Sequence, residues 1–337
     1  MIKIHQNYPL KQSNSFGLES TASIYIETDD SSELINELKN NTIDISNPLF
    51  LGTGSNIVLS TPVVGTVIHA TNKEITVLEE SRDSVLIKCG AGMDWDEFVK
   101  WTVSKNYGGL ENLSLIPGSV GAAPIQNIGA YGTEAAICVE SVVAIDFASA
   151  RKFSLTREEC HFGYRDSQFK RPESKYWMVW EVIFLLEKDP RVNLSYKPLK
   201  EFFPPEYRPD IREIREAVIK IRSSKLPDPA VFGNAGSFFK NPVVSACQAG
   251  LMKEKYPDIP TYYHNPGTVK IPAGWLIETC GWKGLRRGQV GIYPKQALVI
   301  VNYGGATADE IISLANEIQE SVKTEFGIKL EMEVRIV

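Results

Sequence analysis

The segment IPGSVGAAPIQNIGAYG, residues 116–132, constrains the fold more than any other part of this sequence. Connections longer than about 12–15 residues that lack secondary structure are uncommon in compact domains and usually serve a function. Small residues let backbone N–H groups come close to a large flat or phosphorylated ligand. The alternative is an irregular connection, but the length of the segment and its density of small residues favour a ligand-binding loop.

The patterns on both sides of this segment predict strands and helices in mixed order. Amphipathic helices are predicted at 31–40, where Ser31 would be the cap, at 94–107, where Asp94 or Asp96 would be the cap, and at 212–225 and 307–327. Alternating or apolar runs predict strands at 23–27, 63–70, 74–80, 84–90, 141–147, 177–187, 297–302 and 329–337. The predicted fold class is therefore α+β.

Length and composition limit the domain count and the class of protein. A chain of 337 residues is too long for one ordinary core, and the Pro- and aromatic-rich stretch 195–211 suggests a boundary. The net charge of −5, without a basic stripe, argues against nucleic-acid binding. No signal peptide and no run of about 20 apolar residues is present, so we expect no membrane association and a cytoplasmic location. Five scattered cysteines without a CxxC pair predict free thiols and no metal site.

A second glycine-containing segment, GTGSN at residues 52–56, lies between two predicted strands. Its backbone could approach a phosphate, and Ser55 and Asn56 could donate hydrogen bonds from their side chains. On this segment alone a tight turn is the favoured interpretation. It is not a dinucleotide-binding fingerprint, because it has no third glycine and no helix follows it.

Three further segments carry polar residues with two interpretations each. In YRDSQFK, Arg165 could form a surface ion pair with Asp166 or grip a carboxylate with its guanidinium, and the residues alone favour the surface pair. In GNAGSFFKNP, Ser237 is either a turn residue or a hydroxyl proton donor. In LEMEVRIV, Glu331 and Glu333 should share one face of a strand, which is either solvated or functional.

The order of these motifs is more specific than any one of them. GTGSN, IPGSVGAAPIQNIGAYG, YRDSQFK, RSSKLPDP, GNAGSFFKNP, AGWLIE and LEMEVR run through about residues 10–337, and together they resemble the UDP-N-acetylenolpyruvoylglucosamine reductases of peptidoglycan synthesis. The resemblance implies a two-part FAD-binding module of the vanillyl-alcohol-oxidase (PCMH) type and a C-terminal α+β substrate domain. We assign residues 1–70 and 71–212 to the two FAD-binding parts and residues 213–337 to the UDP-sugar domain.

The resemblance also implies the ligands and the residues that contact them. FAD is the expected cofactor, NADPH the reductant and UDP-N-acetylglucosamine enolpyruvate the substrate, on a chain expected to be a monomer. The expected FAD contacts are Gly52, Thr53, Gly54, Ser55, Asn56, Ile116, Pro117, Gly118, Ser119, Gly121, Ala122, Gln126, Asn127, Gly129 and Tyr131. The expected substrate contacts are Tyr196, which marks the subclass with a tyrosine loop, Lys225, Asn241 and Gln296.

The implied catalytic residues are Arg165, Ser237 and Glu333. In the family's reaction a hydride passes from flavin N5 to the vinyl CH2 carbon, and negative charge develops beside the substrate carboxylate. Arg165 would hold that carboxylate, and Glu333 would assist from the other side. Ser237 would deliver the proton that completes the lactyl ether.

One departure from the family pattern and two alternatives stay open. LEMEVR has Met332 where the family usually has proline, which should alter the strand edge but not the acid. An oxygen-using FAD oxidase of the same fold is one alternative, although none of the four histidines lies in the FAD-loop motifs to tether the cofactor. A non-catalytic flavin or nucleotide-sugar binding protein is the other, and the presence of all three catalytic residue types counts against it.

Overall fold

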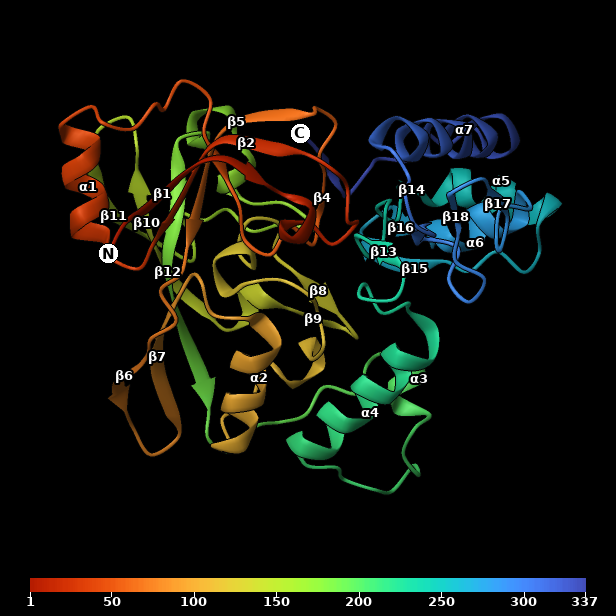
Figure 1. Ribbon diagram of the computed structural model, residues 1–337. Coiled ribbons are helices and arrows are strands. Elements are labelled where there is room, and N and C mark those ends of the chain that lie inside the picture. The colour runs from red at the N-terminus through yellow and green to blue at the C-terminus, as the bar shows by residue number, and fades with distance from the viewer. The chain divides into compact units, whose positions relative to one another are not determined.

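The computed structural model describes residues 1–337 and divides into two compact units, each made of several stretches of chain. The colours of Figure 1 allow each stretch to be followed by residue number. Unit 1 consists of Met1–Tyr8, Thr21–Thr53 and Val63–Ser224, and unit 2 consists of Pro9–Ser20, Gly54–Pro62 and Lys225–Val337.

The first layer of unit 1 is a four-stranded sheet covered by one helix. The strand order is β1 (Lys3–Pro9), β2 (Thr21–Thr28), β5 (Val63–Ala70) and β3 (Leu49–Phe50), and β5 is parallel to both β2 and β3. Helix α1 (Ser31–Lys39) buries Leu34 and Leu38 against this sheet. The predicted helix is present, but its cap is Asp30 rather than Ser31, because the Asp30 carboxylate accepts the N–H groups of Ser32 and Glu33.

The second sheet of unit 1 is antiparallel throughout. Its order is β11 (Arg151–Thr156), β10 (Val139–Asp146), β12 (Trp177–Glu187), β7 (Ser84–Gly90) and β6 (Ile75–Glu80). Helix α2 (Trp95–Ser104) is capped by Asp94, one of the two predicted caps. It packs Trp95 and Phe98 against Phe184 of β12. The N–H of Trp95 donates to the carbonyl of Gly118 at 3.0 Å, so the start of α2 lies beside the glycine-rich segment that follows it.

Unit 1 ends with two helices over a small core of their own. Helices α3 (Lys197–Lys200) and α4 (Ile211–Lys225) enclose Leu199, Ile214 and Val218. Short elements connect the larger ones: β8 (Gly129–Ala130), β9 (Thr133–Glu134) and 3-10 turns at Glu111–Leu113, Val120–Ala122, Ala135–Ile137, Gln168–Lys170 and Pro172–Ser174.

Unit 2 packs three helices around two small sheets. One sheet has the order β13 (Gly233–Asn234), β19 (Ile300–Asn302), β18 (Val290–Ile292) and β17 (Arg286–Arg287), and the other has β14 (Val243–Ser245), β16 (Thr268–Lys270) and β15 (Tyr262–Asn265). The helices are α5 (Ala246–Lys255), α6 (Ala273–Thr279) and α7 (Ala308–Phe326), and a 3-10 turn lies at Lys11–Ser13. Figure 1 shows α7 along one side of this unit, with contacts to α6, β18 and β19.

The predicted C-terminal strand is mostly wrong. Instead of a strand over 329–337, only β20 (Arg335–Ile336) forms, parallel to β4 (Ile57–Val58), and Met332 makes a single bridge to Phe239. Glu331 forms an ion pair with Lys240 and is exposed, whereas Glu333 is half-buried. The chain pairs with two separate segments, residues 238–240 and then residues 56–58, instead of one long neighbour, and the two glutamates lie in different environments.

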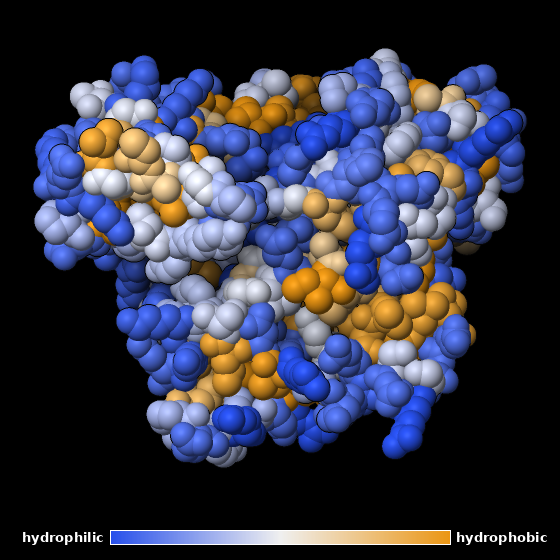
Figure 2. Space-filling view, turned by 180° about the vertical axis from the view of Figure 1, so that it is seen from behind, coloured by the Kyte–Doolittle hydropathy of each residue, from blue (hydrophilic) through white to orange (hydrophobic).

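The predicted α+β class is confirmed by these sheets and helices. Figure 2 shows a largely hydrophilic surface with separate hydrophobic areas, and single exposed apolar side chains are ordinary on proteins of this size. None of the helices has the length and apolar character needed to cross a bilayer.

Candidate active site

The glycine-rich segment 116–132 is an ordered part of unit 1. It contains a 3-10 turn and strand β8, so it is not free of secondary structure. The N–H groups of Val120 and Gly121 donate to the carbonyls of Met93 and Ala91 at 2.8 and 3.0 Å. A Cβ on Gly121 would lie 2.5 Å from the Cβ of Ala91, so only glycine permits this approach.

Asn127 shapes this segment from within. Its side chain is 1% exposed, and its amide nitrogen donates to Glu134 and to the carbonyl of Gly163 at 2.8 and 3.1 Å. Its amide oxygen accepts the N–H of Ala136 at 2.9 Å. We therefore expect Asn127 to act on a bound cofactor through the shape of the loop, because its polar atoms are already used inside the protein.

The two predicted cofactor segments meet at Gly52. A Cβ on Gly52 would lie 2.7 Å from Oγ of Ser119 and 3.7 Å from Cβ of Ala122. Unit 1 therefore brings the two segments together, although more than sixty positions separate them in the sequence. Neighbouring Thr53 is exposed, and Ser119 is 5% exposed, so hydroxyl groups and small side chains line the contact.

Arg165 lies against the same glycine-rich segment. Its Nη2 donates to the carbonyl of Gly129 at 2.7 Å, and its side chain is half-buried. Asp166 pairs with Arg171 at 2.6 Å, so that carboxylate is engaged with another arginine. Arg165 has a backbone φ of 53°, a left-handed conformation that is uncommon for a residue with a side chain and is enriched at functional sites.

Unit 2 places Ser237 and Glu333 on neighbouring stretches of backbone. The N–H of Glu333 donates to the carbonyl of Phe238 at 2.9 Å, one residue after Ser237. The N–H of Phe238 donates to the carbonyl of Leu298 at 2.8 Å, which fixes the serine loop on its other edge. Asn56 joins this group, because its amide nitrogen donates to the carbonyl of Glu333 at 3.2 Å.

The predicted substrate contacts fall into three places. Asn241 accepts the N–H of Ala273 at 2.9 Å, and Oε1 of Gln296 would lie 3.2 Å from a Cβ on Gly274, so both flank the start of α6 in unit 2. Tyr196 belongs to unit 1, where it is 41% exposed and its ring stands edge-on to that of Tyr131, with centroids 5.1 Å apart. Lys225 is exposed at the end of α4.

Comparison with known proteins decides the family. Residues 228–337 match the model of the UDP-N-acetylenolpyruvoylglucosamine reductase C-terminal domain, and residues 24–151 match that of an FAD binding domain. The chain is 44% identical over 335 residues to the UDP-N-acetylenolpyruvoylglucosamine reductase of Porphyromonas gingivalis strain W83, covering 99% of both chains. It is 41% identical to the reductase of that name from Pseudomonas aeruginosa strain PAO1, covering 98% of each. The chain belongs to the UDP-N-acetylenolpyruvoylglucosamine reductase family.

A solved structure shows the same fold. The UDP-N-acetylenolpyruvylglucosamine reductase of Thermus caldophilus superposes with a TM-score of 0.70 over 100% of this chain and 98% of that one, at 24% sequence identity. The predicted resemblance is thus confirmed, and so is the class of enzyme, an FAD-dependent reductase of this family. The roles of the individual site residues and the limits of the predicted binding domains stay predictions.

The residues of unit 1 fit the FAD that this family uses. The contact between Gly52 and Ser119 and that between Gly121 and Ala91 leave no room for a Cβ, so the backbone there is tightly packed and bare of large side chains. The N–H groups of Val120 and Gly121 already donate to carbonyls of the protein, so hydroxyl groups are the donors we expect to reach phosphate oxygens here. Thr53 and Ser119 would supply hydroxyl donors to the pyrophosphate of the cofactor.

Two residues that shape the site, Arg222 and Asn234, were not among the predicted site residues. Arg222 lies in the last turn of α4 and donates to the carbonyl of Leu115, directly before the glycine-rich segment. Asn234 is 4% exposed, and its amide oxygen accepts the N–H of Gly236, which sets the turn that carries Ser237. Arg222 could have been noticed in the sequence, because it lies three residues before Lys225 on a predicted helix and therefore on the same face.

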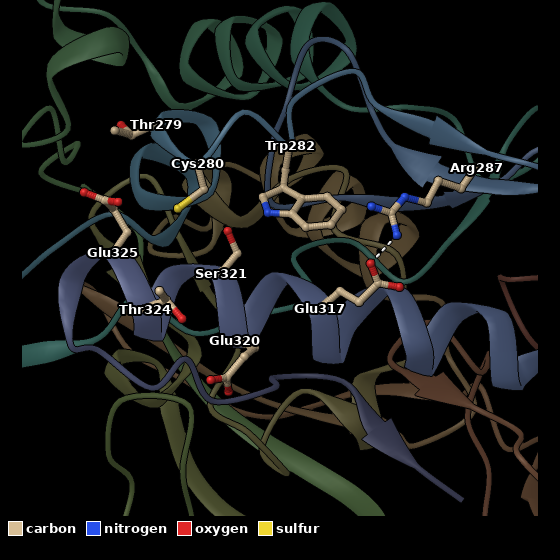
Figure 3. Close-up of a pocket in the computed structure, with 9 residues that line it drawn as sticks. All are labelled: Thr279, Cys280, Trp282, Arg287, Glu317, Glu320, Ser321, Thr324 and Glu325. Atoms are coloured by element: carbon tan, nitrogen blue, oxygen red, sulfur yellow. Dashed lines mark hydrogen bonds and ion pairs between the residues drawn. The ribbon is translucent and has the colours of Figure 1, made fainter.

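A separate cavity of about 630 Å³ in unit 2 is lined by none of the predicted site residues. Figure 3 shows it between α7 and the segment after α6, with Trp282 and Arg287 on one side and glutamates of α7 on the other. Arg287 stacks over the Trp282 ring and pairs with Glu317, so its charge is already balanced. The five cysteines carry free thiols, and no group of three potential His, Cys, Asp or Glu metal ligands occurs in the chain.

Proposed function

We propose that this chain reduces UDP-N-acetylglucosamine enolpyruvate to UDP-N-acetylmuramate, with NADPH as the reductant, in bacterial peptidoglycan synthesis. The observation that carries the proposal is the full-length identity of 41–44% to reductases of this name, together with the presence of all three expected catalytic residues. When bound, FAD would supply the hydride chemistry that links NADPH to the vinyl carbon of the enol ether. The residues of the chain supply the binding, the charge and the proton.

Arg165 is suited to hold the substrate carboxylate. It is half-buried, and one of its terminal nitrogens is anchored on the carbonyl of Gly129, so the guanidinium is oriented before substrate binds. A planar guanidinium pairs with carboxylates in a fixed, bidentate geometry. As charge develops on the carbon beside the carboxylate, a preorganised cation stabilises the transition state more than the ground state.

Ser237 is suited to deliver the proton. Its neighbour Gly236 has φ of 67° and turns the chain so that the serine follows a bend, while the paired Phe238 fixes the residue after it. The hydride and this proton together saturate the carbon–carbon double bond. Glu333, fixed through its backbone to Phe238, would assist as a hydrogen-bonding acid on the same side of unit 2.

The nucleotide-sugar would be held by the remaining predicted contacts. Asn241 and Gln296 at the start of α6 offer amide groups, and Lys225 offers a positive charge for the diphosphate. Tyr196 offers an exposed ring that can cover the nucleotide. A cytoplasmic location, a monomeric state and the absence of a nucleic-acid partner belong to the same proposal.

The test is a Ser237→Ala variant beside a matched Ser313→Ala control, since Ser313 is an exposed serine on α7. Ser237→Ala should lower kcat by about 10²–10⁴, the usual contribution of a positioned proton donor, while the flavin spectrum and its bleaching by NADPH are retained. Ser313→Ala should behave like the native enzyme.

The spectrum of the native enzyme separates the competing functions. Flavin absorbance that bleaches with NADPH without oxygen and returns on adding the enolpyruvyl substrate supports the reductase. Return only with oxygen would support an oxidase, and a protein that takes up no FAD would overturn the assignment to a flavoenzyme. Full turnover by Ser237→Ala would refute the proton-donor role alone.

A further inference from the structure

Leu115, the residue before the glycine-rich segment, has a strained backbone that polar contacts hold in place. Its φ is 59°, a left-handed conformation that is sterically unfavourable for a residue with a Cβ. Its side chain is 37% exposed, so packing does not account for this conformation. Its N–H donates to Asp96 at 2.5 Å, and its carbonyl accepts from Nε of Arg222 at 3.2 Å. Both peptide groups of Leu115 are therefore fixed by charged side chains.

Arg222 also reaches the other end of the segment. Its guanidinium interacts with the side chain of Tyr131, the penultimate residue of 116–132. The arginine side chain as a whole is half-buried, but its guanidinium lies deeper, and burial lowers the pKa of this group against the opposing effects of Tyr131 and Asp96. One cation thus contacts the residue that precedes the segment and a residue near its end.

A second arginine of α4 binds the Asp96 carboxylate in place of Arg222. Arg215 binds the Asp96 carboxylate with both terminal nitrogens, at 2.6 and 2.8 Å. Asp96 therefore has a bidentate partner of its own, and its charge is balanced without Arg222. Arg222 makes its two contacts with uncharged groups, the Leu115 carbonyl and the Tyr131 hydroxyl, which are both parts of the segment or adjoin it.

We propose that Arg222 is a positioning residue that holds the two ends of segment 116–132 together and so preorganises it for FAD. The inference rests on the proposed assignment of this segment to the cofactor. If only a fraction of the molecules holds the loop in its binding-competent conformation, the apparent dissociation constant equals the intrinsic one divided by that fraction. Without Arg222, the strain at Leu115 favours other conformations of the segment before any ligand arrives.

The experiment compares Arg222→Gln with Arg212→Gln, an exposed arginine on the same helix. Apoprotein would be titrated with FAD by fluorescence, and amide hydrogen exchange of residues 115–132 would be measured without FAD. We expect Arg222→Gln to weaken FAD binding by about tenfold, as for a loop that is competent about a tenth of the time, and to speed exchange in the segment. Arg212→Gln should change neither. Tyr131→Phe, which removes one contact without a change of charge, should weaken FAD binding by about threefold on the same reasoning.

Two results would overturn the proposal: native FAD affinity in Arg222→Gln, or unchanged exchange in its segment with a native circular dichroism spectrum. If Arg222→Gln fails to fold, Tyr131→Phe decides by the same two measurements. Failure of the proposed function looks different, because the native apoprotein would then bind no FAD, while the exchange of the segment would still report whether Arg222 holds it.

Discussion

Replacing Asp96 with asparagine should destabilise unit 1 strongly, because the carboxylate accepts three close hydrogen bonds from two residues. It accepts both terminal nitrogens of Arg215, at 2.6 and 2.8 Å, and the N–H of Leu115 at 2.5 Å. The Asp96 and Arg215 side chains are 22% and 11% exposed. Removing one partner of a buried ion pair costs about 3–5 kcal/mol, and the partial exposure of Asp96 lowers this to about 2–4 kcal/mol.

The expected change in melting temperature follows from the size of the unit. For a domain of roughly 200 residues, 1 kcal/mol shifts Tm by about 2–4 °C, so Asp96→Asn should lower the Tm of unit 1 by about 4–16 °C. Calorimetry at pH 7 measures this directly. The matched control is Asp166→Asn, which breaks an aspartate–arginine pair of the same 2.6 Å length whose side chains are 35% and 44% exposed. That exposed pair should contribute about 0–1 kcal/mol.

The same carboxylate predicts a dependence of stability on pH. Burial acts to raise the pKa of Asp96, but the hydrogen bonds from Arg215 and Leu115 outweigh it and lower the pKa below its usual value. A lowered pKa in the folded state stabilises the protein above the unfolded value of about 3.9, and this stabilisation is lost as the pH falls through the folded value. Asp96→Asn should therefore flatten the acid limb of the stability curve. A fall in Tm no larger than that of Asp166→Asn would refute the reasoning.

Two further substitutions test other parts of unit 1. Burial raises the pKa of Glu111, which is 3% exposed. Protonated Glu111 therefore stabilises the folded protein below the pKa of the unfolded state, and this stabilisation is lost as the pH rises through the pKa of the folded state. Glu111→Gln should remove that loss in thermal unfolding between pH 4 and 8, and an unchanged slope of Tm against pH would contradict the prediction. Gly121→Ala would place a Cβ 2.5 Å from that of Ala91, so we expect it to lower the free energy of unfolding by about 1–3 kcal/mol. It should also weaken FAD binding in a fluorescence titration. Native stability and native FAD affinity would show that the segment can move aside.

Local sequence signals predicted helices α1, α2, α4 and α7, but no range was predicted for α3, α5 or α6. The spacing of apolar residues in 307–327 and its ends gave α7, whose capping box of Thr307 and Glu310 and C-terminal Gly327 are all present. Helix α2 likewise begins after Asp94. Such caps depend on residues within four positions of one another, so the sequence alone contains the information.

Long-range pairing was less predictable. The alternation in 329–337 is typical of a strand, yet its residues pair in turn with Lys240, Phe238 and Asn56, so only β20 has strand geometry. The role of Arg222 was also hidden, because its partners Leu115 and Tyr131 are about 90–110 positions away and the carbonyl of Leu115 carries no side-chain signal.

The contacts between motifs explain why their order identified the family when no single motif did. Gly52 packs on Ser119, Arg165 binds the carbonyl of Gly129, and the N–H of Glu333 binds the carbonyl of Phe238. In each pair at least one partner contributes backbone atoms. At that position the fold therefore requires a small side chain or an unusual φ, and many unrelated turns also have a small side chain or an unusual φ. A glycine turn alone is therefore ambiguous. Few folds require several such turns at once, each at a fixed position relative to a different polar motif. The combination of motifs in order therefore identified the family.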